Sequence, residues 1–153
     1  MDTIEEELNA ERKRKKELLI GQINTLKNKL KEINVQKEEL TNQQKELEDF
    51  FNSFNQMFEK YKSGLDSIFN QISNIKYDSS SIDNTLTKIP DINNGIIDIT
   101  SNAMQEIDDK KIDVDKKTEE KAEEINKQLD ELETQANGVQ SQINSLTWQL
   151  NSL

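Results

Sequence analysis

The sequence contains no cysteine and no histidine, and among its 153 residues there are only 1 proline and 4 glycines. Without cysteine the chain can form no disulfide and has no thiol chemistry. Without histidine it lacks the usual general base and the commonest metal ligand of proteins. A glycine-rich loop for binding phosphate is missing as well. We therefore expect a protein that is not an enzyme and that holds neither a cofactor nor a metal.

Large apolar side chains are also scarce. Apolar residues make up 32% of the chain and aromatic residues 5%, whereas charged residues make up 33%. Globular domains usually contain about 45–50% apolar residues, counted with glycine, so this chain can fill narrow seams between helices but not a thick core. The longest apolar run, Leu18–Ile20, is far shorter than the roughly 20 residues of a membrane span. We expect no insertion into a membrane.

Acidic groups outnumber basic ones, and the excess lies in the second half of the chain. The formal net charge is -10; residues 1–76 carry 13 basic and 14 acidic groups, and residues 77–153 carry 7 basic and 16 acidic groups. Nucleic-acid binding requires a positive surface, so we expect no nucleic-acid partner. The acidic residues 1–7 are unlike the basic start of a signal peptide. This favours a cytoplasmic protein, or one exported together with its partner.

What the chain does contain is a long apolar stripe at helical spacing. The stripe steps alternately by four and by three residues, and its clearly polar members are Lys37 and Gln44. An average spacing of 3.5 residues keeps one apolar seam facing a partner helix along its whole length. The apolar members are Leu19, Ile23, Leu26, Leu30, Ile33, Leu40, Leu47, Phe51, Phe54, Phe58, Tyr61, Leu65, Ile68, Ile72 and Ile75.

A second stripe of the same length runs from Ile97 to Leu153. When the two stripes are folded antiparallel, both ends match at once, with Leu26 level with Leu146 at one end. We therefore predict an all-α fold: a long antiparallel helical hairpin, or coiled coil, that forms a single domain. An apolar seam this long, widened in places, also predicts that the hairpin belongs to a multi-helix bundle completed by a partner.

The predicted bend lies between the two stripes. Residues 77–84 are rich in turn-forming side chains, Pro90 is disfavoured inside a helix, and Asp91 is a suitable N-cap. A second interpretation is a small β-hairpin within residues 77–99, with Asn94-Gly95 as its turn. We favour the first interpretation. It gives helices over residues about 3–76 and about 96–153, joined by a loop over residues about 77–95.

Aromatic side chains are concentrated in residues 50–69, partly beside the predicted seam. Phe50, Met57 and Phe69 fall next to the seam positions, as Ile20 does near the start of the first helix. Such neighbours widen a seam toward the broader face of a helix bundle. They are therefore either ordinary core or the contact for a third helix, and both interpretations stay open.

One end of the predicted hairpin carries no charge. Residues 134–153 contain no charged side chain, and neither do residues 19–26, which face them in the hairpin. Exposed coiled-coil faces are normally charged, so this end is either a covered surface or a frayed terminus. Trp148, the only tryptophan, points away from the seam and is a candidate hot spot. The predicted partner-binding residues are Leu18, Ile20, Phe50, Met57, Phe69 and Trp148.

Two charged segments each allow a functional and a plain interpretation. The basic run Arg12–Lys16 could bind nucleic acid or a membrane or act in localisation. Five consecutive residues wrap more than one helical turn, however, so a solvated helix is favoured. The acids within residues 108–124 alternate with lysines and lack the pattern of a calcium loop. A solvated face with salt bridges is favoured there over a cation site.

A short Q-I-x-x-L pattern occurs near both ends of the chain. It stands at Gln22-Ile23-Asn24-Thr25-Leu26 and at Gln142-Ile143-Asn144-Ser145-Leu146. With the turn-rich centre, the chain resembles the small helical accessory proteins encoded beside LXG toxins of the Gram-positive type VII secretion system, which are similar to WXG-type hairpins. The resemblance implies a chaperone-like targeting protein that packs against the helical N-terminal domain of a toxin. It also implies a second small accessory protein as a further partner.

The chain departs from the family pattern at two places. Asn93-Asn94-Gly95 stands where a Trp-x-Gly turn would be, and no Tyr-x-x-x-Asp/Glu export motif follows the second helix. The resemblance therefore implies no export-signal residues. The alternatives are a structural coiled-coil spacer or homodimer, and a subunit of a prefoldin-like chaperone. Residues 77–99 are short for the β-layer of a prefoldin-like protein.

Overall fold

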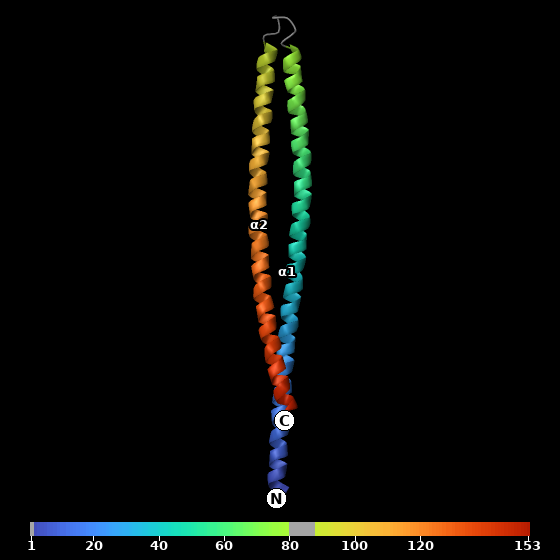
Figure 1. The fold of residues 1–153 in the computed structure, drawn as a ribbon, viewed down its shortest axis with the longest axis vertical. Helices are drawn as coiled ribbons and strands as arrows, with labels where there is room; N and C mark the ends of the chain where they lie inside the picture. Colours follow the sequence, from blue (N-terminus) through green and yellow to red (C-terminus); the bar gives the residue numbers. More distant parts are fainter. Residues whose placement is uncertain (1, 80–87) are drawn as a thin grey trace. The chain divides into compact units, whose positions relative to one another are not determined.

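The described part of the chain forms two long α-helices, α1 (Asp2–Ser79) and α2 (Lys88–Asn151) (Figure 1). A computed structural model describes the backbone of residues 2–79 and 88–153, and the side chains of residues 4–74 and 94–153. The composition explains the length of α1: it contains no proline and only two glycines, Gly21 and Gly64, and each of these costs about 1 kcal/mol relative to alanine.

Packing contacts divide the chain into two compact units. Unit 1 comprises Met1–Lys45 and Glu123–Leu153, and unit 2 comprises Glu46–Ala122. In each unit a segment of α1 lies beside a segment of α2 (Figure 1). The predicted all-α helical hairpin is therefore confirmed within each unit.

The helix bounds near the bend differ from the prediction. α1 continues to Ser79, and α2 begins at Lys88 rather than near residue 96. Pro90 is the third residue of α2, where the backbone N–H has no partner within the helix, so the proline ring breaks no hydrogen bond. Asp91 accordingly lies inside the first turn instead of capping it. Helix over residues 88–99 excludes the alternative β-hairpin, while residues 80–87 of the predicted loop lie outside the described residues.

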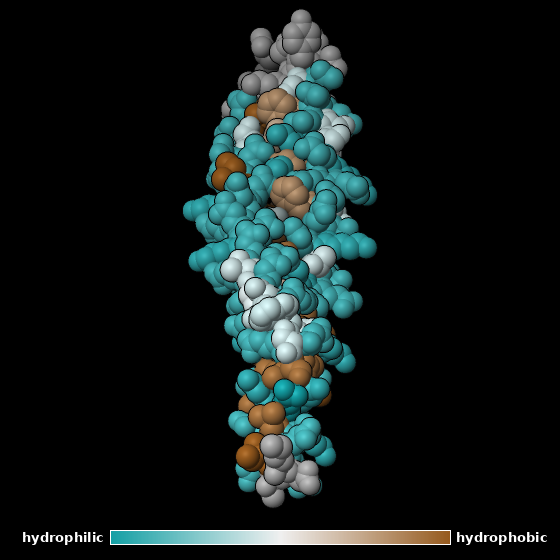
Figure 2. All heavy atoms as spheres, turned by 60° about the horizontal axis from the view of Figure 1, so that its bottom comes forward, coloured by the Kyte–Doolittle hydropathy of each residue, from teal (hydrophilic) through white to brown (hydrophobic). Residues whose placement is uncertain are grey.

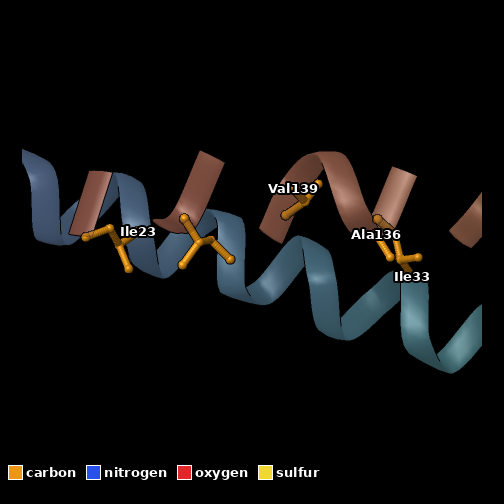
Figure 3. Packing of buried hydrophobic residues seen from close by; sticks show 5 residues of the cluster. Ile23, Ile33, Ala136 and Val139 are labelled. Atoms are coloured by element: carbon orange, nitrogen blue, oxygen red, sulfur yellow. The ribbon is translucent and has the colours of Figure 1, made fainter. Parts of the chain in front are cut away.

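The core of unit 1 is a narrow apolar seam between the two helices. Ile23 and Ile33 of α1 pack with Ala136, Val139 and Ile143 of α2, and Figure 3 shows these side chains in the space between the ribbons. Partly buried leucines extend the seam on both sides: Leu26, Leu30, Leu132, Leu146 and Leu150. Leu26 and Leu146, predicted to be level with each other, belong to this one cluster.

The two polar members of the stripe in unit 1 bridge the helices. Lys37 Nζ donates a hydrogen bond to the Glu133 carboxylate, and Gln44 Nε2 donates one to Asn126 Oδ1 at 3.0 Å. The partner's number falls as the number in α1 rises, so the helices run antiparallel. Polar groups that pair across a seam select one register.

The start of α1 has no cover from α2. In unit 1 this end of α1 extends beyond the last residue of α2 (Figure 1), and the side chains of residues 4–18 are all exposed. The basic run Arg12–Lys16 lies in this exposed helical stretch. Its placement agrees with the favoured interpretation, a solvated piece of helix.

In unit 2 the buried stripe of α1 departs from the prediction at two positions after Phe58, which is 6% exposed, while Leu65 and Ile72 are half-buried as predicted. Tyr61 and Ile68, predicted for the seam, are 62% and 48% exposed, whereas Lys62 and Phe69 are half-buried. The stripe takes two successive steps of four here, from Phe54 through Phe58 to Lys62. Such a stutter returns the stripe to the natural period of the α-helix.

The second helix supplies the physical reason for this shift. Its stripe also takes two successive steps of four, from Val114 through Thr118 to Ala122, all of which are half-buried. A helix whose apolar stripe rotates in this way can stay in contact only with a partner whose stripe rotates as well. α1 therefore follows α2, and two of its apolar side chains are left outside the seam.

Candidate partner-binding surfaces

The stutter leaves an uncovered apolar stripe on α1 in unit 2. We call it the aromatic face; its exposed members are Phe50, Met57, Tyr61, Gly64 and Ile68, and the half-buried seam residue Phe54 lies between the first two. They recur at steps of four and three residues, the spacing at which one helix presents a stripe to another. Four of them are strongly exposed: Phe50 at 54%, Met57 at 50%, Tyr61 at 62% and Ile68 at 48%. Figure 2 shows that isolated apolar side chains are exposed between hydrophilic ones on the face of the molecule in view.

The aromatic face has an ordered aromatic end and a shallow hollow. The rings of Phe50 and Phe54 stack with their centroids 6.2 Å apart. Further along α1, a groove of about 480 Å³ lies over Met57, Tyr61 and Ile68. A Cβ atom added at Gly64 would meet nothing within 4 Å, so this glycine keeps the groove open toward solvent.

The structure corrects part of the predicted site here. Phe50 and Met57 are exposed as predicted, but Phe69 is half-buried in the seam of unit 2. Tyr61 and Ile68 take its place on the surface, and the sequence analysis missed both. The signal in the sequence that could have revealed Tyr61 and Ile68 was the pair of successive four-residue steps in the apolar stripe of α2.

A second surface lies at the uncharged end, in unit 1. It is a groove of about 820 Å³ between α1 and α2, which we call the terminal groove. Apart from Glu17, every side chain that lines it is uncharged. The lining residues are Glu17, Leu18, Gly21, Gln22, Thr25, Leu26, Gln142, Ser145 and Leu146.

The other predicted contacts of this end lie outside the terminal groove. Trp148 is 72% exposed and Ile20 is 46% exposed, and neither lines it. The carbonyl oxygen of Trp148 accepts hydrogen bonds from Ser152, at 3.1 Å from the backbone N and at 2.8 Å from Oγ. The backbone at Trp148 is thus held by the last turn, while its indole ring is open to solvent.

The charged segment of α2 in unit 2 is a face with salt bridges, as the favoured interpretation predicts. Asp113 pairs with Lys117 at 2.9 Å, and Asp115 pairs with Lys111 at 2.6 Å. The hydrogen bond from Lys117 is the main cause that lowers the pKa of Asp113, and the same bond raises the pKa of Lys117. Within the described part of the chain, no three acidic groups lie close enough together to hold a metal ion.

Comparison with known proteins identifies no relative, so function is inferred from the aromatic face and the terminal groove. No protein-family model matches the chain, and no curated protein or solved structure shows significant similarity to it. In the described part of the chain, no helix is long and apolar enough to cross a membrane.

Proposed function

We propose that the protein is a non-enzymatic binding protein that packs against the helices of a partner protein. The observation that carries this proposal is the aromatic face, where four large apolar side chains at helical spacing are about half exposed or more. Contiguous apolar patches on a soluble protein mark interaction sites. A partner helix would use such a stripe through anchors spaced three, four and seven residues apart.

The resemblance to LXG accessory proteins supplies the partner to test first. This partner is the helical N-terminal domain of a type VII secreted toxin encoded beside the protein, with a second small accessory protein as an additional subunit. Binding to such a domain would make the protein a targeting chaperone that acts in the cytoplasm or is exported with its toxin. The terminal groove and Trp148 offer a second contact to the same partner.

Co-purification with the neighbouring toxin's N-terminal domain tests this proposal. We expect the wild-type protein to form a stable complex, and the double variant Met57→Glu, Tyr61→Glu to lose about thirtyfold or more in affinity, the loss typical of a hot spot. Ile112→Glu is the matched control, because Ile112 is 66% exposed and lies on α2 of the same unit. Circular dichroism should show unchanged helicity for both variants.

A variant in unit 1 tests the second contact. Trp148→Ala should weaken the complex by about 2 kcal/mol, or roughly thirtyfold, and should leave the melting of the free protein unchanged because the ring is 72% exposed. Normal binding by both the aromatic-face variant and Trp148→Ala would rule out these surfaces. A stable homodimer that ignores the toxin domain would favour the spacer instead.

A further inference from the structure

The seam between α1 and α2 has two long sides, which we call the edges of unit 2. The contacts in the structure show which residues lie on the same edge. Side chains that directly precede a seam residue line one edge on both helices, as Leu18, Gln22 and Ser145 do in the terminal groove of unit 1. Side chains that directly follow a seam residue lie on the opposite edge. In unit 2 that opposite edge is marked by Asp108, which follows Ile107 and meets Lys62 Nζ at 3.4 Å.

The edge marked by Asp108 is acidic. The spacing of a helix places residues three, four or seven positions apart on one side. Seven carboxylates, three on α1 and four on α2, directly follow seam residues. No basic residue among the described side chains of unit 2 does so, apart from those in the seam itself. The seven are Glu48, Glu59 and Asp66 on α1 and Asp98, Asp108, Asp115 and Glu119 on α2.

The aromatic face lies along the other edge, because its exposed members directly precede seam residues: Tyr61 precedes Lys62, and Ile68 precedes Phe69. On α2 this edge carries three exposed lysines, Lys110, Lys117 and Lys121. It also carries two acids that precede seam residues, Glu106 and Asp113, and Asp113 is already paired with Lys117 at 2.9 Å. On α1 the same edge carries Glu46 beyond the start of the aromatic face.

The apolar stripe of α1 and the lysines of α2 thus lie along the same edge of unit 2. A helix lying on this edge would bury its apolar side against α1 and turn its flank toward the lysines of α2. An acidic flank would gain attraction from these lysines and would lie away from the seven carboxylates of the opposite edge. At physiological salt, charges more than about 8 Å apart are largely screened. The charges on this edge of α2 therefore set the preferred sign, and there three lysines stand against Glu106 and Asp113.

We propose that the aromatic face binds an amphipathic helix with acidic flanks. This inference rests on the proposed function and names the chemistry of the partner. A second copy of the chain fits less well, because twofold pairing of two aromatic faces would bring the lysines of each copy toward those of the other. Like charges placed opposite each other disfavour a partner.

Two designed peptides test the inference on the full chain. Both have about 28 residues, enough to form a helix on their own, with leucine at the core positions of each heptad. One carries glutamate at the flanking positions and the other carries lysine. Fluorescence anisotropy of the labelled peptides should show that the glutamate peptide binds about tenfold more tightly than the lysine peptide at physiological salt.

Variants of the protein locate the binding and its charge preference. Lys110→Glu with Lys117→Glu should reverse the preference for the glutamate peptide. Lys116→Glu should not, because Lys116 does not precede a seam residue and pairs with Glu120 at 3.9 Å. Tyr61→Ser should weaken binding of the glutamate peptide about tenfold, and Ile112→Ser should leave it unchanged. Circular dichroism should show that all four proteins remain helical.

Several results would overturn the inference. The inference is wrong if both peptides bind equally or if the glutamate peptide does not bind. It is also wrong if the double lysine variant still prefers the glutamate peptide, or if Tyr61→Ser leaves its binding unchanged. A concentration-dependent homodimer that Tyr61→Ser abolishes would replace the acidic helix by a second copy. If the toxin domain still co-purifies in any of these cases, the proposed function stands and only the acidic chemistry of this face is wrong.

Discussion

At the scale of single residues, a few polar groups decide how the apolar seam is aligned. Leucines and isoleucines at regular spacing can pair in several registers, each shifted by a heptad. Lys37 with Glu133 and Gln44 with Asn126 pair across the helices in one register only. These contacts are exposed at the surface and contribute little to stability, so their main effect is on alignment.

The pair of Lys37 and Glu133 predicts a dependence of stability on pH. The hydrogen bond from Lys37 is the main cause that lowers the pKa of Glu133 below its usual value. A carboxyl group whose pKa is lowered by folding stabilises the folded state at pH values above its pKa in the unfolded chain, which is about 4.3 for glutamate. This stabilisation is lost as the pH falls through the pKa that the group has in the folded protein. The difference in Tm between wild type and Glu133→Gln should therefore be largest near neutral pH and shrink below about pH 4.3.

Thermal melts followed by circular dichroism, from about pH 7 to about pH 3, measure this difference across the relevant range. Glu131→Gln is a matched control, because Glu131 is exposed and lies in the same turn of α2. A difference for Glu133→Gln that stays constant across the range would mean that the ion pair with Lys37 is absent in solution.

At the scale of helices, periodicity alone predicted most of the fold. Each member of the predicted α2 stripe is buried or half-buried, from Ile97 to Leu153, and so is the α1 stripe from Leu19 to Phe58. The α1 prediction is wrong at Tyr61 and Ile68, whereas Leu65 and Ile72 are half-buried as predicted. The error arises because an unbroken sequence pattern does not show which side of the helix its partner covers. The stutter of α2 rotates the seam, and the heptad pattern of α1 continues on a face that α2 does not cover.

The same limit applies to the predicted contacts. Exposure of Leu18, Phe50, Met57 and Trp148 could be predicted because each lies off the stripe in the sequence. Tyr61 lies on the stripe, and only the packing of unit 2 shows that its side chain is 62% exposed. Which residues lie on each edge of unit 2 also depends on which positions form the seam. The difference between the acidic edge and the edge with the aromatic face and lysines therefore became visible only with the structure.

Two isoleucines of α2 provide a matched test of the seam. Ile125 is 2% exposed and Ile112 is 66% exposed. Ile125→Ala should lower the free energy of unfolding by about 2–5 kcal/mol, because it leaves a cavity in a packed seam, whereas Ile112→Ala should change it by less than about 0.5 kcal/mol. Urea unfolding followed by circular dichroism measures both values. Equal effects of the two variants would contradict the helix pairing described for α2.

At the scale of the whole molecule, the negative charge is distributed unequally. Residues 46–122, which form unit 2, carry 9 basic and 16 acidic groups, and the remaining residues, which form unit 1, carry 11 basic and 14 acidic groups. Unit 2 thus holds -7 of the net charge of -10. A net charge of this size destabilises a folded state through self-repulsion, which added salt screens.

This charge predicts that salt stabilises the free protein. Between about 0.01 M and 0.15 M salt the Debye length falls from roughly 30 Å to 8 Å, so repulsion between separated carboxylates weakens. The ion pairs in the structure are partly or fully exposed and worth little at any salt concentration. We therefore expect Tm to rise with sodium chloride, by roughly 2–4 °C for each kcal/mol of repulsion removed.

Neutralising variants show whether the repulsion resides in unit 2. Asp66→Asn with Glu119→Gln removes two carboxylates from the acidic edge, and should raise Tm at about 0.01 M salt and flatten its rise with salt. Glu38→Gln with Glu39→Gln makes the same change in unit 1, whose basic and acidic groups nearly balance, and should raise Tm less. A Tm that falls as salt is added would mean that attraction between opposite charges outweighs repulsion, and the acidic edge would then be stabilised by contacts of its own.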